Sequence, residues 1–318
     1  MPPRRTIGID AGGTKLLGGV LDEDLVVHHR VHRIWRGEGT PETLDIMVGA
    51  VEELRAVAPE VEAVGFGIPA LVDQSTGKAL WSTHLPLEDL PFRDLMSERL
   101  GLPVHVDNDA TLALLAESRR GAARGARHAV LLTLGTGIGS GLLLDGRLYR
   151  GARGAGAELG HLVVDLHGPD CQGACPGRGC LEVLASGRAI MRAGQEAALT
   201  HPESALGRRH ASGRGITGPI VTEMAHEGDD VARGVLAEIG TRLGYGLTSV
   251  VNALGPEVIV VGGGAVAAGE LLLGPARAVV AERGLPPARE LVRIVAAEFG
   301  DESGMVGAAV FALEAGRV

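Results

Sequence analysis

Three cysteines and a histidine gather in the middle of the chain. Cys171, Cys175 and Cys180 lie within ten residues of one another, and His161 precedes them by ten. Three thiolates and one imidazole suit tetrahedral zinc, whose structural sites have four protein ligands. An odd, clustered set of thiols also argues against a disulfide framework and favours a reducing compartment. We therefore predict a structural zinc site in this segment, with chance clustering of free thiols as the alternative.

Two glycine-rich loops, each following an apolar strand, could bind phosphate. Glycine carries no Cβ, so backbone N–H groups in such loops can face an anion. Alone, the first loop is explained equally well by a hairpin turn, but a second loop in a comparable place favours phosphate binding. Neither matches the P-loop pattern. The candidate nucleotide-binding residues are Asp10, which could also hold a hydrated Mg²⁺, and Gly12, Gly13, Thr14, Lys15, Gly135, Thr136 and Gly137.

A third glycine turn, Gly262, Gly263 and Gly264, follows a short apolar strand. With the next three residues it fits a Gly-x-Gly-x-x-Ala dinucleotide fingerprint. It lies too near the C-terminus, however, to leave room for the second half of a dinucleotide fold. An adenosine-contacting turn is the better interpretation.

Polar residues also occur where a strand gives way to a helix, at Asp107, Asn108 and Asp109. Asp and Asn favour helix starts because they accept hydrogen bonds from free N–H groups, so capping explains one such residue. Three in a row are explained less well. Beside two phosphate loops, a carboxylate here could accept the proton of a hydroxyl group, with Asn108 orienting the substrate. We predict that Asp109 is this base.

The elements that must position these residues follow from apolar periodicity. Expected strands are 6–9, 16–21, 25–31, 61–68, 102–106, 129–134, 141–144, 258–261 and 292–297. Expected helices are 41–58 with Thr40 as N-cap, 108–118, one from about 181, 230–254 and 304–314. Residues 200–216, rich in His, Arg, Gly and Ser, are expected to form a loop or exposed insertion.

The order strand, glycine turn, strand occurs near residue 10 and again near residue 135, as an internal duplication would produce. We expect two α/β domains around a cleft. The first comprises residues 1–118 and is completed by a C-terminal helix at about 303–318. The second comprises residues 119–302 and carries the zinc loop at 161–182.

Composition limits the function classes. The chain has 318 residues, 45% apolar residues and a net charge of −9, without a long run of like charge. This composition is typical of a globular protein and disfavours binding to nucleic acid. The N-terminus lacks a signal-peptide pattern, and no apolar stretch is long enough to span a membrane. We expect a cytoplasmic location.

The ordered combination of motifs resembles the ROK family (repressors, open reading frames and kinases) over almost the whole chain. The matching segments are Asp10–Lys15, Asn108–Ala110, Gly135–Gly141, Gly154–His161, Cys175–Glu182 and Gly262–Gly264. This resemblance implies an actin-like, ribonuclease H-like two-domain ATPase fold that uses MgATP. It implies transfer of the γ-phosphoryl group to the 6-hydroxyl of a hexose, with glucose preferred, as in bacterial glucokinases.

The resemblance also implies roles for individual residues. Asp109 would be the general base, and His161 would bind both zinc and sugar through its two ring nitrogens. The expected sugar-binding residues are Thr83, His84, Asn108, Asp109, Glu158, His161 and Glu182. The expected zinc ligands are His161, Cys171, Cys175 and Cys180. The chain departs from the usual pattern in having three residues between Cys171 and Cys175 where one is common, and in having His84 where asparagine is frequent.

Three alternatives to a glucokinase differ in how well the sequence supports them. Family repressors carry an N-terminal DNA-binding domain, for which a first motif at Asp10 leaves no room. A sugar sensor without catalysis is disfavoured by the presence of Asp109. A kinase for mannose, fructose, N-acetylmannosamine or N-acetylglucosamine is excluded by no residue, and the choice of ATP or polyphosphate as donor is open. The expected partners are a hexose and ATP, with no nucleic acid or membrane, and a homodimer or higher homo-oligomer is expected.

Overall fold

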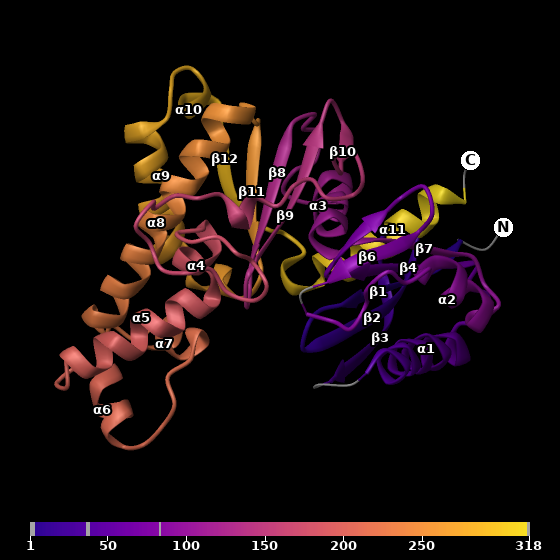
Figure 1. The fold of residues 1–318 in the computed structure, drawn as a ribbon, viewed down its shortest axis with the longest axis horizontal. Coiled ribbons are helices and arrows are strands. Elements are labelled where there is room, and N and C mark those ends of the chain that lie inside the picture. The colour runs from indigo at the N-terminus through magenta and orange to yellow at the C-terminus, as the bar shows by residue number, and fades with distance from the viewer. Residues whose placement is uncertain (1–3, 36–38, 83, 317–318) are drawn as a thin grey trace. The chain divides into compact units, whose positions relative to one another are not determined.

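The computed structural model describes residues 4–35, 39–82 and 84–316, which form two compact units (Figure 1). Unit 1 comprises Met1–Gly125, Gly141–Ala157 and Asp301–Val318, and unit 2 comprises Ala126–Ser140 and Glu158–Gly300. The expected division at residue 118 differs for residues 119–125 and 141–157, which belong to unit 1. Segment 141–157 belongs there because its residues pack on the helix that starts at Asp109: a Cβ on Gly141 would lie 2.9 Å from the carbonyl oxygen of Ala110.

The first sheet is built around the first glycine turn. Its strand order is β3-β2-β1-β4-β7, in which β1, β2 and β3 form the predicted antiparallel meander and β4 and β7 run parallel to β1. The strands are β1 (Arg5–Ala11), β2 (Lys15–Asp22), β3 (Val27–Ile34), β4 (Ala63–Ile68) and β7 (Val104–Asn108). A separate hairpin pairs β5 (Ala70–Asp73) with β6 (Lys78–Ser82).

The described part of unit 1 contains the helices α1 (Thr40–Val57), α2 (Phe92–Leu100), α3 (Asp109–Arg120) and α11 (Ser303–Ala315). The predicted N-cap of α1 is wrong. Gly39 occupies that position without a side-chain cap, Thr40 is the first helical residue, and its hydroxyl donates to the carbonyl oxygen of Pro86 at 2.6 Å. A proline at the second position supplies the fixed backbone angle that starts the helix instead.

Helix α11 packs against β1, β4 and α3 through glycines (Figure 1). A Cβ on Gly8 would lie 2.0 Å from the carbonyl oxygen of Met305, and one on Gly65 would lie 1.8 Å from that of Ala308. On the helix itself, a Cβ added to Gly307 would lie 1.8 Å from the carbonyl oxygen of Leu112. These positions admit only glycine because backbone lies directly against backbone.

The second sheet repeats the topology of the first. Its order is β10-β9-β8-β11-β12, with β10 antiparallel to β9 and with β11 parallel to both β8 and β12. Numbered within each sheet by chain order, both read third, second, first, fourth, fifth, as the predicted duplication requires. The strands are β8 (Ala129–Leu134), β9 (Ile138–Leu144), β10 (Arg147–Tyr149), β11 (Val258–Gly262) and β12 (Arg293–Ala296).

The helices of unit 2 depart from expectation in two places. The helix predicted from residue 181 is interrupted at Ser186, whose hydroxyl accepts a hydrogen bond from the N–H of Ala189 and starts a second helix. The expected loop at 200–216 contains a helix, α6. The helices are α4 (Leu181–Ala185), α5 (Gly187–Thr200), α6 (Ala205–Ala211), α7 (Gly218–His226), α8 (Asp230–Leu254), α9 (Glu270–Arg283) and α10 (Ala288–Leu291). Within the described ranges, no helix is long and apolar enough to cross a membrane.

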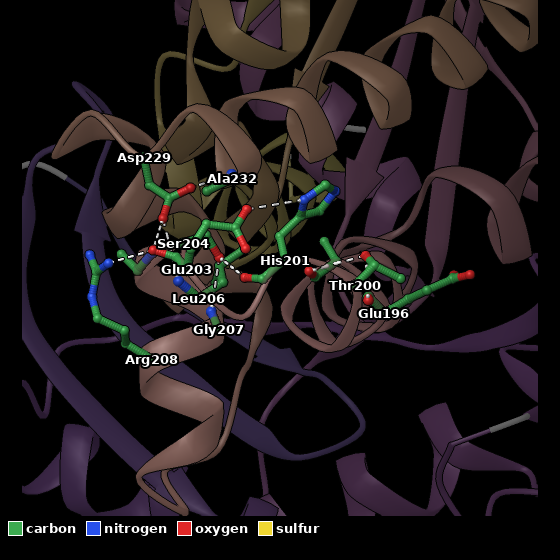
Figure 2. Close-up of polar contacts among 12 residues, drawn as sticks. Glu196, Thr200, His201, Glu203, Ser204, Leu206, Gly207, Arg208, Asp229 and Ala232 are labelled. Atoms are coloured by element: carbon green, nitrogen blue, oxygen red, sulfur yellow. Dashed lines mark hydrogen bonds and ion pairs between the residues drawn. The ribbon is translucent and has the colours of Figure 1, made fainter.

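Helix α6 forms because polar side chains satisfy its first N–H groups (Figure 2). The Ser204 hydroxyl accepts from the N–H of Gly207 at 2.9 Å, and Asp229 Oδ2 accepts from the N–H of Ala205. The other carboxylate oxygen of Asp229 caps α8 by accepting from the N–H of Ala232 at 2.9 Å. One carboxylate therefore starts two helices, and this long-range contact overrides the loop-like composition of the segment.

Candidate active site

The first glycine turn joins β1 to β2, as predicted. Two of its carbonyl oxygens are held by Trp35, a contact that no local pattern in the sequence indicates. The indole Nε1 donates to Gly12 at 3.0 Å, and the Trp35 N–H donates to Thr14 at 3.3 Å. The Trp35 side chain is buried. A buried indole N–H needs an acceptor, and that requirement is the one signal by which this contact could have been anticipated.

His84 lies against this turn. A Cβ on Gly13 would fall 2.8 Å from the Cβ of His84, so glycine is needed for the approach. His84 is exposed, and its charge acts on Asp109, which places it near both the turn and the predicted base. Thr83, also predicted to contact sugar, lies outside the described residues.

Asp10, at the end of β1, has an unusual protonation equilibrium. Burial raises its pKa to about 7, the charge of Asp109 adds to the rise, and Lys15 opposes it. The carboxylate rests on the first turn of α11, where a Cβ on Gly304 would lie 2.6 Å from a carboxylate oxygen. Asp10, Lys15 and Asp109 therefore form one electrostatic group within unit 1.

Asn108 and Asp109 occupy the end of β7 and the start of α3. Asn108 Oδ1 accepts from the N–H of Thr111 at 3.0 Å and caps the helix. Asp109 Oδ1 accepts from the N–H of Ala110 at 2.8 Å. Burial raises the pKa of Asp109, while this hydrogen bond and the charge of His84 oppose the rise. Asn108 is thus the residue that caps the helix, and the N-cap position does not use the Asp109 carboxylate.

A buried ion pair, which was not predicted, joins Arg150 to Asp107, the residue directly before Asn108. Arg150 Nε donates to Asp107 Oδ2 at 2.6 Å, and Arg150 Nη2 lies 2.6 Å from the same oxygen in an ion pair. Asp107 Oδ1 accepts from the N–H of Asn108 at 2.8 Å. Burial raises the pKa of Asp107, and the guanidinium group of Arg150 opposes this. Arg150 stands at the end of β10, so this pair links segment 141–157 to the strand that carries Asn108.

The second glycine turn lies at the start of unit 2, between β8 and β9. Only Gly135, Thr136 and Gly137 form the turn, because β9 begins at Ile138, three residues before the expected strand start at 141. The Gly135 N–H donates to the Gly137 carbonyl oxygen at 3.0 Å, which closes the turn on itself.

Glu182 binds the backbone at the C-terminal end of this turn. It is buried, and its Oε2 accepts from the N–H of Ile138 at 2.8 Å. Glu182 follows Cys180 closely in sequence, so the predicted metal segment and the second glycine turn are connected by this carboxylate. Its other oxygen, Oε1, accepts no hydrogen bond within the described ranges.

The four predicted metal ligands come together in unit 2. The ligand atoms of His161, Cys171, Cys175 and Cys180 all lie within 4.8 Å of one another, and Cys171 Sγ is 3.7 Å from His161 Nδ1. Ligands around a tetrahedral zinc ion are separated by about 3.6 Å, given bond lengths of roughly 2.3 Å to sulfur and 2.0 Å to nitrogen. The donor set and spacing fit a metal ion, and the longer interval between Cys171 and Cys175 does not remove Cys171 from the cluster.

Backbone groups around the cluster favour thiolate ligands. The Gly177 N–H donates to Cys175 Sγ at 3.4 Å. A Cβ on Gly177 would lie 3.1 Å from Cys180 Sγ, so glycine lets the backbone approach both sulfurs. Since Nδ1 of His161 faces the cluster, Nε2 is the ring nitrogen left for another partner. Exposed Glu158 directly precedes the short helix η1 (Leu159–His161).

The third glycine turn follows β11. Gly263 has φ of 78°, a conformation that favours glycine, and a Cβ there would lie 2.7 Å from the carbonyl oxygen of Leu134 at the end of β8. Gly264 starts the short helix η2 (Gly264–Ala268). The second and third turns thus adjoin within unit 2.

The predicted residues therefore form two local groups. Unit 1 holds Asp10, Gly12, Gly13, Thr14, Lys15, His84, Asn108 and Asp109, and unit 2 holds Gly135, Thr136, Gly137, Glu158, His161, Glu182, the three cysteines and Gly262, Gly263 and Gly264.

Comparison with known proteins identifies close relatives of the whole chain. Residues 6–315 match the model of the ROK family. A glucokinase of Thermotoga maritima is 34% identical over 312 residues, covering 97% of this chain and 97% of that relative. A glucokinase of Streptomyces coelicolor is 35% identical over 317 residues, covering 97% and 98%. The solved structure of a ROK family glucokinase from Streptomyces griseus, in complex with glucose and AMPPNP, has a TM-score of 0.89 at 34% identity, covering 98% of this chain and 99% of that chain.

Proposed function

The chain belongs to the ROK family, and from this membership and the geometry around Asp109 we infer that it is an ATP-dependent glucokinase. It has the actin-like α/β sugar-kinase fold predicted from its sequence. It transfers the γ-phosphoryl group of ATP to the 6-hydroxyl of glucose. The observation that carries the inference is Asp109, a buried carboxylate with a raised pKa in the first turn of α3, whose charge acts on Asp10 beside the first glycine turn.

Asp109 acts as the general base. Burial raises its pKa and makes it a stronger base than an exposed aspartate, so the carboxylate can take the proton of the sugar hydroxyl as the new phosphate ester forms. The hydrogen bond from the Ala110 N–H and the charge of His84 oppose this rise in the pKa. Asn108 Oδ1 caps α3 and Nδ2 donates one hydrogen to the carbonyl oxygen of Ala70 at 3.5 Å, so the second Nδ2 hydrogen is the part that can orient the sugar.

The glycine turns bind the phosphates. Lys15 and the N–H groups of the turn at Gly12–Thr14 stabilise negative charge on the transferred group, and Asp10 holds a hydrated Mg²⁺. In unit 2, the turn at Gly135–Gly137 supplies further N–H donors, and the turn at Gly262–Gly264 contacts the adenosine. Phosphoryl transfer depends mainly on such positioning and charge stabilisation.

His161 and the three cysteines would hold zinc, which would fix the position of the neighbouring sugar-binding residues of unit 2. His161 would bind the metal through Nδ1, the ring nitrogen that faces the cysteines, which leaves Nε2 for a sugar hydroxyl. Glu158 and the free oxygen of Glu182 bind neighbouring hydroxyls. The role of zinc is structural because all four protein ligands are supplied. We also propose that the protein works as a homodimer or higher homo-oligomer in the cytoplasm and without nucleic acid.

A coupled assay of ADP release tests the function. The purified protein should phosphorylate glucose with ATP, and Asp109→Asn should lower kcat at least about 1,000-fold while leaving the unfolding temperature within a few degrees. Asp94→Asn, which changes an exposed aspartate on α2, is the matched control and should behave as wild type. Wild-type turnover in Asp109→Asn would contradict the assignment of the base.

The same assay decides the substrate. Mannose, fructose, N-acetylmannosamine and N-acetylglucosamine are tested beside glucose, because His84 stands at a predicted sugar contact where asparagine is frequent. A higher kcat/KM for one of them would replace glucose in the proposal. Polyphosphate in place of ATP tests the donor.

A further inference from the structure

The turn at Gly135–Gly137 is held by a side chain from the metal segment. Gln172 follows Cys171 directly, and its Nε2 donates to the carbonyl oxygen of Thr136 at 3.0 Å. Gln172 and Thr136 both belong to unit 2.

This hydrogen bond fixes the direction of the next N–H group. The Thr136 carbonyl and the Gly137 N–H belong to one planar trans peptide, so they point in opposite directions. When Gln172 holds the carbonyl, the Gly137 N–H must point the other way. Among the residues that the structure describes, the N–H groups of Thr136 and Gly137 donate to no protein acceptor, whereas those of Gly135 and Ile138 are already used. The peptide that Gln172 holds therefore presents one of the two free donors of the turn.

Side chains also pack directly on Gly137. A Cβ at this position would lie 2.2 Å from Glu182 Oε2 and 3.5 Å from Gln172 Nε2. Glu182 and Gln172 thus restrict the same peptide, and rotating it would break the Gln172 hydrogen bond. A peptide held in this way can bind an anion without reorganisation, which is the main requirement for electrostatic stabilisation by backbone donors.

The first glycine turn has the same arrangement. There the Gly12 carbonyl oxygen accepts from Trp35 Nε1 at 3.0 Å, which directs the Gly13 N–H in the opposite sense. Each of the two turns thus has one carbonyl fixed by a side chain from elsewhere in its unit. This recurrence indicates that holding the peptide is a requirement of the turn, and that Gln172 is more than a surface contact.

We propose that Gln172 is a positioning residue for the nucleotide, which orients the Gly137 N–H toward a phosphate group and ties the phosphate turn to the metal segment. The proposal rests on the inferred kinase function. It predicts a specific kinetic pattern, because a residue that acts on the phosphate turn affects ATP and leaves the sugar unaffected.

The test compares Gln172→Leu with wild type in the metal-loaded full chain. KM for ATP and Kd for Mg-AMPPNP, measured calorimetrically without turnover, should both rise roughly five- to tenfold, as expected for loss of one neutral hydrogen bond. KM for glucose should change less than about twofold, since the hydrogen bond of Gln172 goes to Thr136 and, among the described residues, to none of those predicted to bind sugar. Gln172→Glu should raise both ATP constants further, because a carboxylate oxygen would face the Thr136 carbonyl oxygen.

Gln195→Leu is the matched control. Gln195 Nε2 donates to the carbonyl oxygen of Ile216 at 3.1 Å, a bond of the same kind on α5, away from the turn. The Gln195→Leu variant should leave KM for ATP, Kd for Mg-AMPPNP and KM for glucose unchanged. Elemental analysis of each variant establishes equal metal content, and if Gln172→Leu loses metal, Gln172→Met takes its place in the same measurements.

The outcomes separate the two inferences. Unchanged KM for ATP and unchanged Kd for AMPPNP in a metal-loaded Gln172 variant would overturn the positioning role. The kinase function would still stand in that case if the wild-type protein phosphorylates glucose. A parallel rise in KM for glucose would also overturn the positioning role, since it would indicate general distortion. Absence of sugar phosphorylation by the wild type would overturn the function, and weak AMPPNP binding by the variant alone would still support the positioning role.

Discussion

The ion pair between Arg150 and Asp107 allows the cost of an unpaired buried charge to be measured. The Asp107 side chain is 3% exposed and the Arg150 side chain 23%. Arg150→Gln would leave the carboxylate with the Asn108 N–H as its remaining hydrogen-bond donor. Removing one partner of a buried pair costs about 3–5 kcal/mol. Since Arg150 is partly solvated, we expect about 3 kcal/mol of lost stability, or roughly 6–12 °C in the unfolding temperature.

The loss should depend on pH in a known direction. Burial raises the folded pKa of Asp107 above its ordinary value of 3.8, so the folded protein binds the proton more tightly than the unfolded chain. The contribution of such a group to stability falls as pH rises from the unfolded pKa through the folded pKa. Without Arg150 the folded pKa rises further, because the opposing cation is gone. The free energy of unfolding that Arg150→Gln loses relative to wild type should therefore be largest at pH 8 and decrease toward pH 5.

Urea unfolding of wild type and variant at pH 8, 6.5 and 5 measures this. Arg120→Gln is the control, because Arg120 pairs with Asp24 at 3.2 Å on the surface, and its loss should cost no more than about 1 kcal/mol at any of these pH values. Equal stability of Arg150→Gln and wild type at pH 8 would refute the reasoning. So would a deficit that grew on acidification.

Two further predictions concern the remaining ionisable clusters. Cys171→Ser should lower the metal affinity by more than about tenfold, because one of four ligands is lost; metal content after dialysis measures this, and full retention would remove Cys171 from the ligand set. Asp10→Asn should raise the free energy of unfolding by about 1–3 kcal/mol at pH 8 and by less at pH 5. The folded pKa of about 7 lies above the ordinary value of 3.8, so the cost of ionising the buried carboxylate grows as the pH rises from 3.8 to about 7. Thermal unfolding at both pH values tests this, and a variant less stable than wild type at pH 8 would contradict it.

Features encoded by neighbouring residues were predictable from sequence. The turn after β1 combines an apolar run with Asp10 and glycines, and both signals act within a few residues. The cysteine cluster was equally accessible, because three thiols and one imidazole at such close spacing are typical of a zinc site. The run of polar residues predicted a helix start at Asn108, and the structure places Asn108 as the N-cap and Asp109 as the first helical residue.

Contacts between distant residues were not predictable. Nothing near Trp35, Arg150 or Gln172 in sequence indicates that these side chains reach Gly12, Asp107 and Thr136. The same limit explains the errors in the helices and strands. The residues of α6 favour a loop until Asp229 caps them, and the glycines of β9 disfavour a strand until sheet pairing stabilises it.

The placement of α11 has a consequence for how the protein is made. Unit 1 begins with β1 but is closed by a helix that the ribosome synthesises only after all of unit 2. Until then, Gly8 and Gly65 present a bare groove on the nascent sheet, with no side chains to shield the backbone. Unit 2, whose main segment lies wholly upstream of α11, can complete its fold first. The half of the molecule that carries Asp109 is thus the last to mature, and active enzyme cannot form before translation of α11 is complete.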